Sequence, residues 1–153
     1  MREGKLQIYC GSGKGKTTAA LGQAIKEASL GRSVFVVQFM IQRLEPEIKL
    51  FRFQRREAAF EDLAPEEQQE EIMNMKNGLN FAKKVLATGE CDVLILDEVL
   101  GLVEQGIVSA EEVHELLGEA SDTTELIFTG IKLCPEMMDW ADDVYQITAL
   151  KES

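Results

Sequence analysis

A glycine-rich stretch between a short apolar segment and an amphipathic segment constrains this chain more than any other feature. It runs from Ile8 to Thr18 and reads IYCGSGKGKTT. Glycines in such a turn can adopt backbone angles that other residues avoid, so successive N–H groups can point at one anion. A helix that begins directly after the turn adds the positive end of its dipole. The stretch therefore predicts a phosphate-binding loop, and the alternative is a glycine-rich turn without a ligand.

The predicted phosphate loop carries its own candidate ligands. Lys16 supplies a flexible positive charge, and the Thr17 hydroxyl can ligate a divalent metal. The loop departs from the usual pattern G-x-x-x-x-G-K-[ST], because Cys10 stands where the first glycine is expected and the nearest glycine is Gly11. The candidate nucleotide-binding residues of the loop are Gly11, Ser12, Gly13, Lys14, Gly15, Lys16, Thr17 and Thr18.

A pair of carboxylates follows an apolar segment later in the chain. Residues 93–96 read VLIL, and Asp97 and Glu98 come next. Mg²⁺ prefers oxygen ligands, and a phosphate-binding loop needs an acidic partner for this metal. Either carboxylate can bind the metal directly or through a water, and Glu98 can alternatively orient a water for hydrolysis. The simpler alternative is a strand that ends in Asp because a loop begins there. The predicted ligands of Mg²⁺ (or Mn²⁺) are Thr17, Asp97 and Glu98.

The order of the predicted elements favours the α/β class. Strands are predicted at residues 5–10, 33–39, 49–53, 93–98, 125–129 and 144–148, and helices at 17–30, 65–86, 99–105, 109–117 and 135–140. Strands that alternate with helices indicate a mostly parallel sheet, here of five to six strands, with helices on both faces. The length of 153 residues and the lack of a linker predict a single domain over residues 1–153.

Ligands of a parallel sheet bind at the carboxyl ends of its strands. Three features follow predicted strand ends, namely the phosphate loop, the pair Asp97-Glu98, and the pair Thr129-Gly130. We therefore expect all three at one edge of the sheet.

Two helices carry apolar stripes that predict their buried faces. The stripe of helix 17–30 consists of Ala20, Leu21, Ala24, Ile25 and Ala28, and that of helix 65–86 of Ile72, Met75, Leu79, Ala82 and Leu86. Met73 and Met75 are both interpreted as core-filling residues.

Charge and cysteine content narrow the classes of function. The net charge of −11 argues against a nucleic-acid-binding protein. Residues 1–56 hold 11 Lys/Arg and 4 Asp/Glu, whereas residues 57–153 hold 5 and 23, so positive charge gathers around the phosphate loop. This suits an anionic small molecule, and the alternative is a set of solvated surface arginines. Three cysteines without a C-x-x-C pair, no apolar run of membrane length and no room for a signal peptide predict a cytoplasmic protein without a membrane partner.

The single histidine does not point to catalysis. His114 lies within the predicted helix 109–117, so it is interpreted as a surface or half-buried helix residue. We see no basis for a nucleophilic triad. Trp140 is interpreted as a packing residue.

The motifs, taken together and in order, resemble those of the P-loop corrinoid adenosyltransferases of vitamin B12 biosynthesis and salvage. That family is similar in its loop, G-x-G-K-G-K-T-T, which also lacks the first glycine. Further resemblance lies in residues 36–39 (VVQF), residues 89–98 (GECDVLILDE) and Thr129-Gly130. The resemblance spans nearly the whole chain, as a form shortened at both ends. Residues 51–60 offer three phenylalanines where the family has a tryptophan.

The resemblance implies a three-layer P-loop NTPase-like (RecA-like) fold and a specific reaction. ATP and Mg²⁺ bind, Co(I) of a corrinoid attacks C5′ of the ribose, and triphosphate leaves. It implies catalytic roles for Lys16 and Glu98, and phosphate or metal contacts for Thr17 and Thr18. Arg55, Arg56 and Phe60 are candidate contacts to the corrinoid. A reductase or flavoprotein that supplies electrons, and a homodimer, are further expectations.

Two other functions are open on the sequence. The first is a P-loop ATPase or phosphotransferase, in which Glu98 orients water or an acceptor hydroxyl. The second is a non-catalytic protein that binds ATP or corrinoid. The products formed from ATP separate the three readings.

Overall fold

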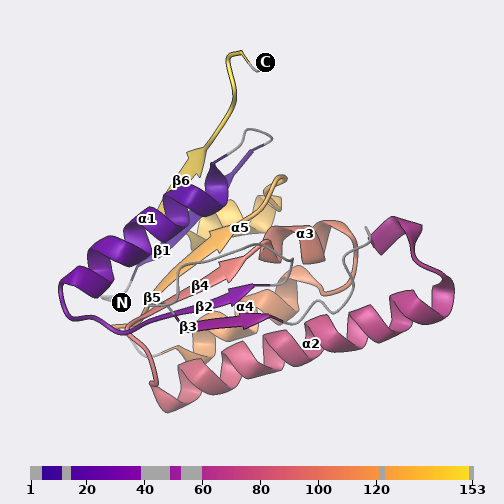
Figure 1. The fold of residues 1–153 in the computed structure, drawn as a ribbon, viewed down its shortest axis with the longest axis horizontal. Coiled ribbons are helices and arrows are strands. Elements are labelled where there is room, and N and C mark those ends of the chain that lie inside the picture. The colour runs from indigo at the N-terminus through magenta and orange to yellow at the C-terminus, as the bar shows by residue number, and fades with distance from the viewer. Residues whose placement is uncertain (1–4, 12–14, 39–48, 53–59, 121–122, 152–153) are drawn as a thin grey trace.

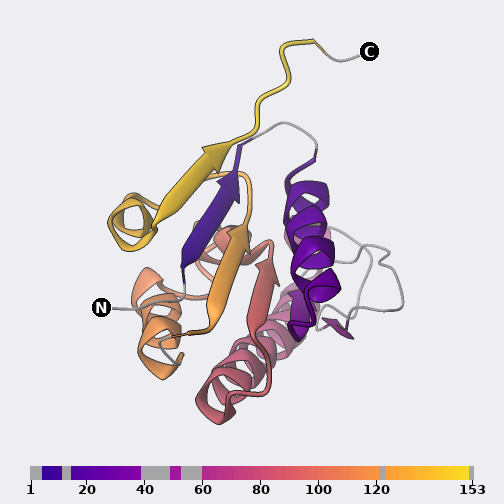
Figure 2. The same ribbon diagram turned by 90° about the vertical axis from the view of Figure 1, so that its left-hand side faces the viewer.

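The computed structural model describes residues 5–11, 15–38, 49–52, 60–120 and 123–151. Within these ranges six strands form one sheet in the order β3-β2-β4-β5-β1-β6, and every neighbouring pair is parallel. Figure 2 shows the arrowheads of β6, β1, β5 and β4 pointing in one direction. The strands are β1 (Leu6–Cys10), β2 (Val34–Gln38), β3 (Lys49–Arg52), β4 (Val93–Asp97), β5 (Glu125–Thr129) and β6 (Asp143–Gln146).

Helices cover both faces of this sheet (Figure 1). On one face, α1 packs on a small apolar cluster, and on the other face α2, α3, α4 and α5 pack on a larger one. The described helices are α1 (Lys16–Ser29), α2 (Pro65–Thr88), α3 (Val99–Glu104), α4 (Ala110–Glu119), α5 (Pro135–Trp140) and the 3₁₀ turn η1 (Phe60–Asp62). The predicted α/β class, with a parallel sheet between helical layers, is confirmed.

The alternation of side chains along each strand produces the two apolar clusters. In β4, Val93 and Ile95 belong to the cluster under α1, whereas Leu94 and Leu96 belong to the larger cluster. Ala20 and Ala24 are fully buried in α1, and their small side chains leave room for the helix to lie close to the sheet. Strands buried on both faces explain why the sequence segments are continuously apolar.

Local signals set several helix ends as predicted. Pro65 occupies the first turn of α2, and the carboxylate of Glu67 accepts a hydrogen bond from the Ala64 N–H at 3.1 Å. The Ser109 hydroxyl accepts from the Glu112 N–H at 3.1 Å and so caps α4. Gly31, at φ 82°, follows the end of α1.

Several details of the predicted elements are wrong. The helices α2 and α4 each end two residues later than predicted, at Thr88 and Glu119. Ile25 is 55% exposed and Ala28 is exposed, because α1 instead turns Glu27 inward, where Arg32 neutralises its charge. Met73 is 64% exposed on α2, so only Met75 fills the core. The last strand, β6, ends at Gln146, two residues earlier than predicted.

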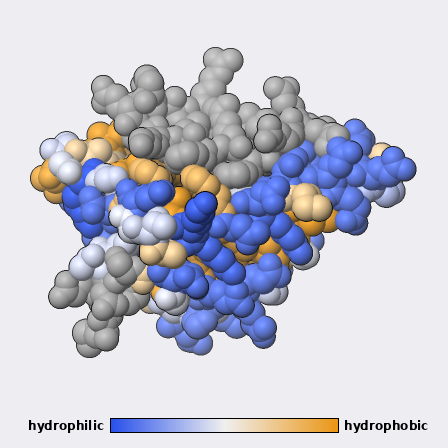
Figure 3. Space-filling view, turned by 90° about the horizontal axis from the view of Figure 1, so that it is seen from below, coloured by the Kyte–Doolittle hydropathy of each residue, from blue (hydrophilic) through white to orange (hydrophobic). Residues whose placement is uncertain are grey.

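The surface on the side of α2 is predominantly polar. Figure 3 shows hydrophilic residues over most of the coloured part of this face, with apolar residues between them. None of the helices that the structure describes is both long enough and apolar enough to cross a membrane.

Candidate functional site

The phosphate loop and the carboxylate pair lie at the same edge of the sheet but not on neighbouring strands. The loop follows β1, the carboxylates end β4, and β5 lies between these two strands. The register pairs Leu96 of β4 with Phe128 of β5, and Tyr9 of β1 with Thr129 of β5. The end of β5 is therefore positioned to bridge the two halves of the candidate site.

The described ends of the phosphate loop show why glycine is needed there. Gly11 has φ 116° and Gly15 has φ 108°, a range that side chains disfavour. The Gly11 N–H donates to the Ile131 carbonyl at 2.9 Å, and the Ile147 N–H donates to the Cys10 carbonyl at 2.8 Å. The start of the loop is thus fastened to the chain segments that follow β5 and β6. From Gly15 the chain enters α1, whose first residue is Lys16.

A buried hydroxyl connects the two carboxylate residues. Thr129 is fully buried, and its Oγ1 donates to Oδ1 of Asp97 at 2.7 Å. The same oxygen accepts a hydrogen bond from the Glu98 N–H, also at 2.7 Å. Asp97 itself is only 1% exposed. A buried carboxylate requires such partners, because ionised groups away from water are costly when they are unpaired.

The alternation of β4 aims Asp97 toward the layer of α1. Asp97 has the same parity as Val93 and Ile95, which pack in the cluster under that helix. Because the phosphate loop leads into the same helix, the carboxylate and the loop share one face and one edge of the sheet. The ends of β1, β4 and β5 thus lie at one edge of the parallel sheet, as expected, and the roles of the residues there stay predictions.

Glu98 has an unusual backbone conformation and a raised side-chain pKa. It adopts φ 66° and ψ 20°, and among the described residues it is the one non-glycine residue with a positive φ. Burial raises the pKa of its carboxyl, and repulsion from Asp97 raises it further, whereas the positive charge of Lys16 lowers it. Strained backbone and shifted pKa values gather at functional sites, so both observations fit a site here.

The carboxylates fit a hard divalent cation, with most of its ligands coming from elsewhere. Among the described residues no group of three or more His, Cys, Asp and Glu side chains could hold a metal by itself. Mg²⁺ is usually bound by one or two carboxylates together with phosphate oxygens and waters, not by an all-protein cage. The adjacent pair Asp97-Glu98, at the same edge of the sheet as the phosphate loop, could supply these carboxylates.

Several predicted site residues fall outside what the structure describes. Ser12, Gly13, Lys14, Arg55 and Arg56 are outside the described residues, and so is the side chain of Thr17. Their predicted roles stay predictions.

For two further predicted site residues, Thr18 and Phe60, the structure gives the position but does not test the predicted role. Thr18 is exposed in the first turn of α1. Phe60 begins η1 and packs partly buried against the larger cluster, where the Gln68 side chain donates to its carbonyl at 3.0 Å. Its predicted contact with the substrate also stays a prediction.

Gly130 is a structural requirement of the site that the sequence did not reveal. A Cβ atom built on Gly130 would lie 2.2 Å from Cβ of Leu100, which is buried in α3. Only glycine lets the end of β5 pack this closely on the helix that follows Glu98. The position of Gly130 directly after a predicted strand was the available signal in the sequence. The contact with Leu100, however, depends on the order of the strands in the sheet.

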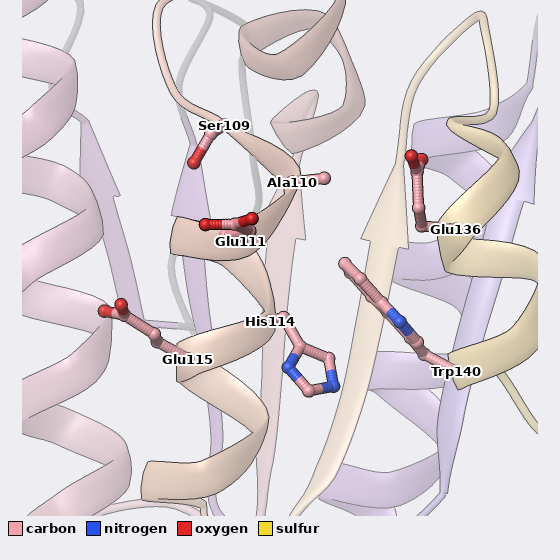
Figure 4. Close-up of a pocket in the computed structure, with 7 residues that line it drawn as sticks. All are labelled: Ser109, Ala110, Glu111, His114, Glu115, Glu136 and Trp140. Atoms are coloured by element: carbon pink, nitrogen blue, oxygen red, sulfur yellow. The ribbon is translucent and has the colours of Figure 1, made fainter.

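The described hollow around His114 lies apart from the phosphate loop. It has a volume of about 690 Å³ between α4 and α5, where the ring centroids of His114 and Trp140 lie 4.6 Å apart with the ring planes tilted by 51° (Figure 4). Glu115 points away from the rings and pairs with Lys83 of α2 at 2.7 Å. His114 is an exposed residue of α4 and Trp140 packs on the larger cluster, so the predictions of a surface helix residue and of a packing residue are confirmed.

A glycine-rich loop between a strand and a helix, with a pair of carboxylates at the same edge of a parallel sheet, defines the class of P-loop α/β proteins. Residues 2–153 match the family model described as ATP:corrinoid adenosyltransferase BtuR/CobO/CobP. The chain therefore belongs to this family of enzymes.

Curated relatives agree with this assignment. The corrinoid adenosyltransferase of Escherichia coli K12 is 28% identical over 98% of this chain and 79% of its own length. The corrinoid adenosyltransferase CobA of Salmonella typhimurium LT2 shows the same identity and coverage. A corrinoid adenosyltransferase of Pseudomonas aeruginosa is 24% identical over 98% of this chain and 77% of its own length.

Proposed function

We propose that this enzyme transfers the 5′-deoxyadenosyl group of ATP to Co(I) of a corrinoid and releases triphosphate. The observation that supports this most is the convergence of Lys16, Asp97 and Glu98 at one sheet edge, next to a loop without the usual first glycine. Membership of the family gives the two substrates, ATP and a corrinoid.

The bond changes define what the protein has to do. The cobalt supplies both electrons of the new Co–C5′ bond and is oxidised from Co(I) to Co(III). The C5′–O bond breaks, and its electron pair leaves with triphosphate. Negative charge therefore grows on the leaving group, and Lys16 and N–H groups of the phosphate loop would stabilise it.

A divalent metal would add positive charge to the triphosphate when bound. Thr17, Asp97 and Glu98 are the residues that would hold it, with Mg²⁺ as the expected ion and Mn²⁺ as a substitute. The roles of the protein groups are then to orient the phosphate chain and to balance its charge. Asp97 is already aimed by Thr129, and Glu98 lies within the electrostatic influence of Lys16.

This reaction needs no general base from the protein, because the nucleophile is the cobalt of the substrate. The single histidine of the chain, His114, contacts Trp140 in a tilted arrangement of the two rings, on α4 and not at the phosphate loop, in keeping with such a reaction. An ATPase, in contrast, has to activate a water.

The remaining roles are part of the same proposal. Arg55 and Phe60 contact the corrinoid, with Arg56 as a neighbour. A reductase or flavoprotein supplies the electrons that make Co(I). Residues 1–153 form a single domain, and the active form of the enzyme is a cytoplasmic homodimer. Size-exclusion chromatography with light scattering tests the assembly.

The experiment combines ATP, Mg²⁺ and chemically reduced cobalamin with the protein. We expect the corrin absorption spectrum to change to that of the alkylated form and triphosphate to appear in equal amount. Formation of ADP and phosphate would instead indicate an ATPase or phosphotransferase. Binding of ATP without turnover of reduced corrinoid would contradict the proposal and leave a binding protein.

A further inference from the structure

We infer that Thr129 is a positioning residue, which holds the Asp97-Glu98 pair in the arrangement that binds metal-bound ATP. This inference rests on the proposed function, since it concerns the same site. It assigns to Thr129 a task that is carried out through Asp97 and Glu98, and it predicts which property of the enzyme changes when the hydroxyl is removed.

The hydrogen-bond directions around Thr129 follow from its chemistry. A hydroxyl has one proton to donate and lone pairs to accept. The Glu98 N–H occupies the acceptor side at 2.7 Å, so the single proton points at Oδ1 of Asp97, also 2.7 Å away. The Thr129 side chain is fully buried and Asp97 is 1% exposed, so water does not replace either contact easily. One hydroxyl thereby sets both the side chain of Asp97 and the backbone of Glu98.

The backbone of Glu98 needs this support because its conformation is strained. A residue with a side chain at φ 66° is disfavoured relative to the right-handed region. Two hydrogen bonds keep it there: its N–H donates to Thr129, and its carbonyl accepts from the Gly101 N–H at 3.0 Å. This backbone conformation sets the direction of the Glu98 side chain at the end of β4, and α3 begins at the next residue.

Thr129 is itself held in place from both sides. Tyr9 pairs with Thr129 in the β1–β5 register, so its main chain belongs to the strand that leads into the phosphate loop. The following residue, Gly130, packs so closely on Leu100 that a Cβ would overlap it at 2.2 Å. The main chain that carries the hydroxyl is therefore fixed between β1 and β4. Through its two hydrogen bonds, the hydroxyl in turn fixes the side chain of Asp97 and the backbone of Glu98.

The expected consequence is specific to the metal. Groups that orient the ligands of a metal commonly change metal affinity by about 10- to 100-fold when they are removed. Without the hydroxyl, Asp97 loses its aim and Glu98 loses one of its two backbone restraints. The hydrogen bonds of the Thr129 hydroxyl run to Asp97 and Glu98, so we expect binding of ATP without metal to change little.

The test compares three variants by calorimetric titration of ATP, with Mg²⁺ varied and then removed by a chelator. Thr129→Val preserves the branched shape without the hydroxyl, and Thr129→Ser preserves the hydroxyl. Thr124→Val makes the same change at a threonine that is 3% exposed and directly precedes β5 at its other end. Thermal unfolding of each variant separates folding defects from site defects.

We expect Thr129→Val to need about tenfold more Mg²⁺ for half-maximal ATP binding, and to bind ATP like the wild type in the presence of the chelator. Thr129→Ser and Thr124→Val should keep the wild-type dependence on Mg²⁺. If Thr129→Val does not fold, Thr129→Ala serves as the second variant without a hydroxyl. A folded hydroxyl-free variant with the wild-type Mg²⁺ dependence would overturn the inference. If the wild type itself shows no Mg²⁺-dependent ATP binding, the proposed function fails as well, so the two failures are distinguishable.

Discussion

The carbonyl oxygen of Ile147 lies where a side chain on Gly11 would begin. A Cβ atom on Gly11 would approach this oxygen to 2.3 Å, which is shorter than any tolerable contact. Ile147 follows β6, and its N–H also donates to the Cys10 carbonyl at 2.8 Å. The first glycine of the phosphate loop is therefore required by the chain segment after the last strand, in addition to its φ of 116°.

Gly11→Ala should be strongly destabilising and should weaken ATP binding. The new methyl group has to displace the segment at Ile147 or distort the loop, and the positive φ adds a conformational cost of about 1 kcal/mol or more. Urea denaturation measures the free energy of unfolding, and calorimetry measures ATP affinity. We expect a loss of stability of about 3 kcal/mol.

The matched control is Gly89→Ala, at the end of α2. Gly89 has φ 67°, but no atom lies within 4 Å of a Cβ built there. Its substitution should cost only the conformational strain, about 1 kcal/mol, with no effect on ATP affinity. Equal losses for the two variants would show that the contact with Ile147 is unimportant.

Lys16→Met should reduce adenosyl transfer by at least about 100-fold, because a positive charge that stabilises the leaving triphosphate is lost. The long apolar side chain preserves the volume of the lysine stem, so stability should change little. Lys26→Met, in the last turn of the same helix, is the control and should leave turnover unchanged. The rate of corrin alkylation under saturating ATP is the measurement, and a Lys16→Met enzyme with the wild-type rate would remove Lys16 from the site.

Much of this architecture could be predicted from the sequence because its signals are local. Continuous apolar runs mark strands buried on both faces, and Pro65, Ser109 and Gly31 mark helix ends through properties of single residues. The rule that ligands gather at the carboxyl ends of parallel strands then brings the phosphate loop and the carboxylates to one edge.

The parts that could not be predicted depend on which strands are neighbours. The sequence does not show that β5 separates β1 from β4, and only this order makes Thr129 the partner of Asp97. The apolar period of α1 likewise favoured Ile25 as a buried residue, but Glu27 is buried instead and pairs with Arg32. The ion pair between Arg32 and Glu125 of β5, which holds this arginine against the sheet, is a tertiary contact that the period does not show.

Arg32→Ala should destabilise the fold by about 1–3 kcal/mol, because the buried carboxylate of Glu27 loses its positively charged partner and keeps only the hydrogen bond from Gln23. Nη1 of Arg32 lies 2.7 Å from Glu27 and 3.1 Å from Glu125, and so joins the end of α1 to the start of β5. Glu27 is 8% exposed, so water cannot fully replace the arginine. Chemical denaturation is the measurement, and ATP affinity should be unchanged because these residues lie at the strand end opposite the phosphate loop.

The comparison for Arg32→Ala is Lys83→Ala. Lys83 pairs with Glu115 at the same distance of 2.7 Å, but the Glu115 side chain is 63% exposed. Exposed pairs contribute less than about 1 kcal/mol, so this variant should be nearly as stable as the wild type. A larger loss for Lys83→Ala than for Arg32→Ala would contradict the view that burial decides the contribution.

Without metal, Glu98→Gln should be more stable than the wild type, and this difference in the free energy of unfolding should grow as the pH rises. The same variant should show a weaker dependence of ATP binding on Mg²⁺. Burial and the neighbouring charge of Asp97 raise the pKa of Glu98, so the folded state holds this proton more tightly than the unfolded state does. The wild type therefore loses stability as pH rises from the ordinary carboxyl range through the raised pKa, and the glutamine variant, which cannot ionise, does not.

Glu115→Gln provides a control of opposite sign, because the Lys83 ammonium lowers the pKa of Glu115 and ionisation there favours folding. Denaturation curves at a series of pH values with a chelator present give both differences. The advantage of Glu98→Gln over the wild type should grow with pH and then level off, whereas Glu115→Gln should show no advantage at any pH. An advantage of Glu98→Gln that shrinks with rising pH would mean that the carboxylate is stabilised in the folded state, opposite to the effect that its burial produces.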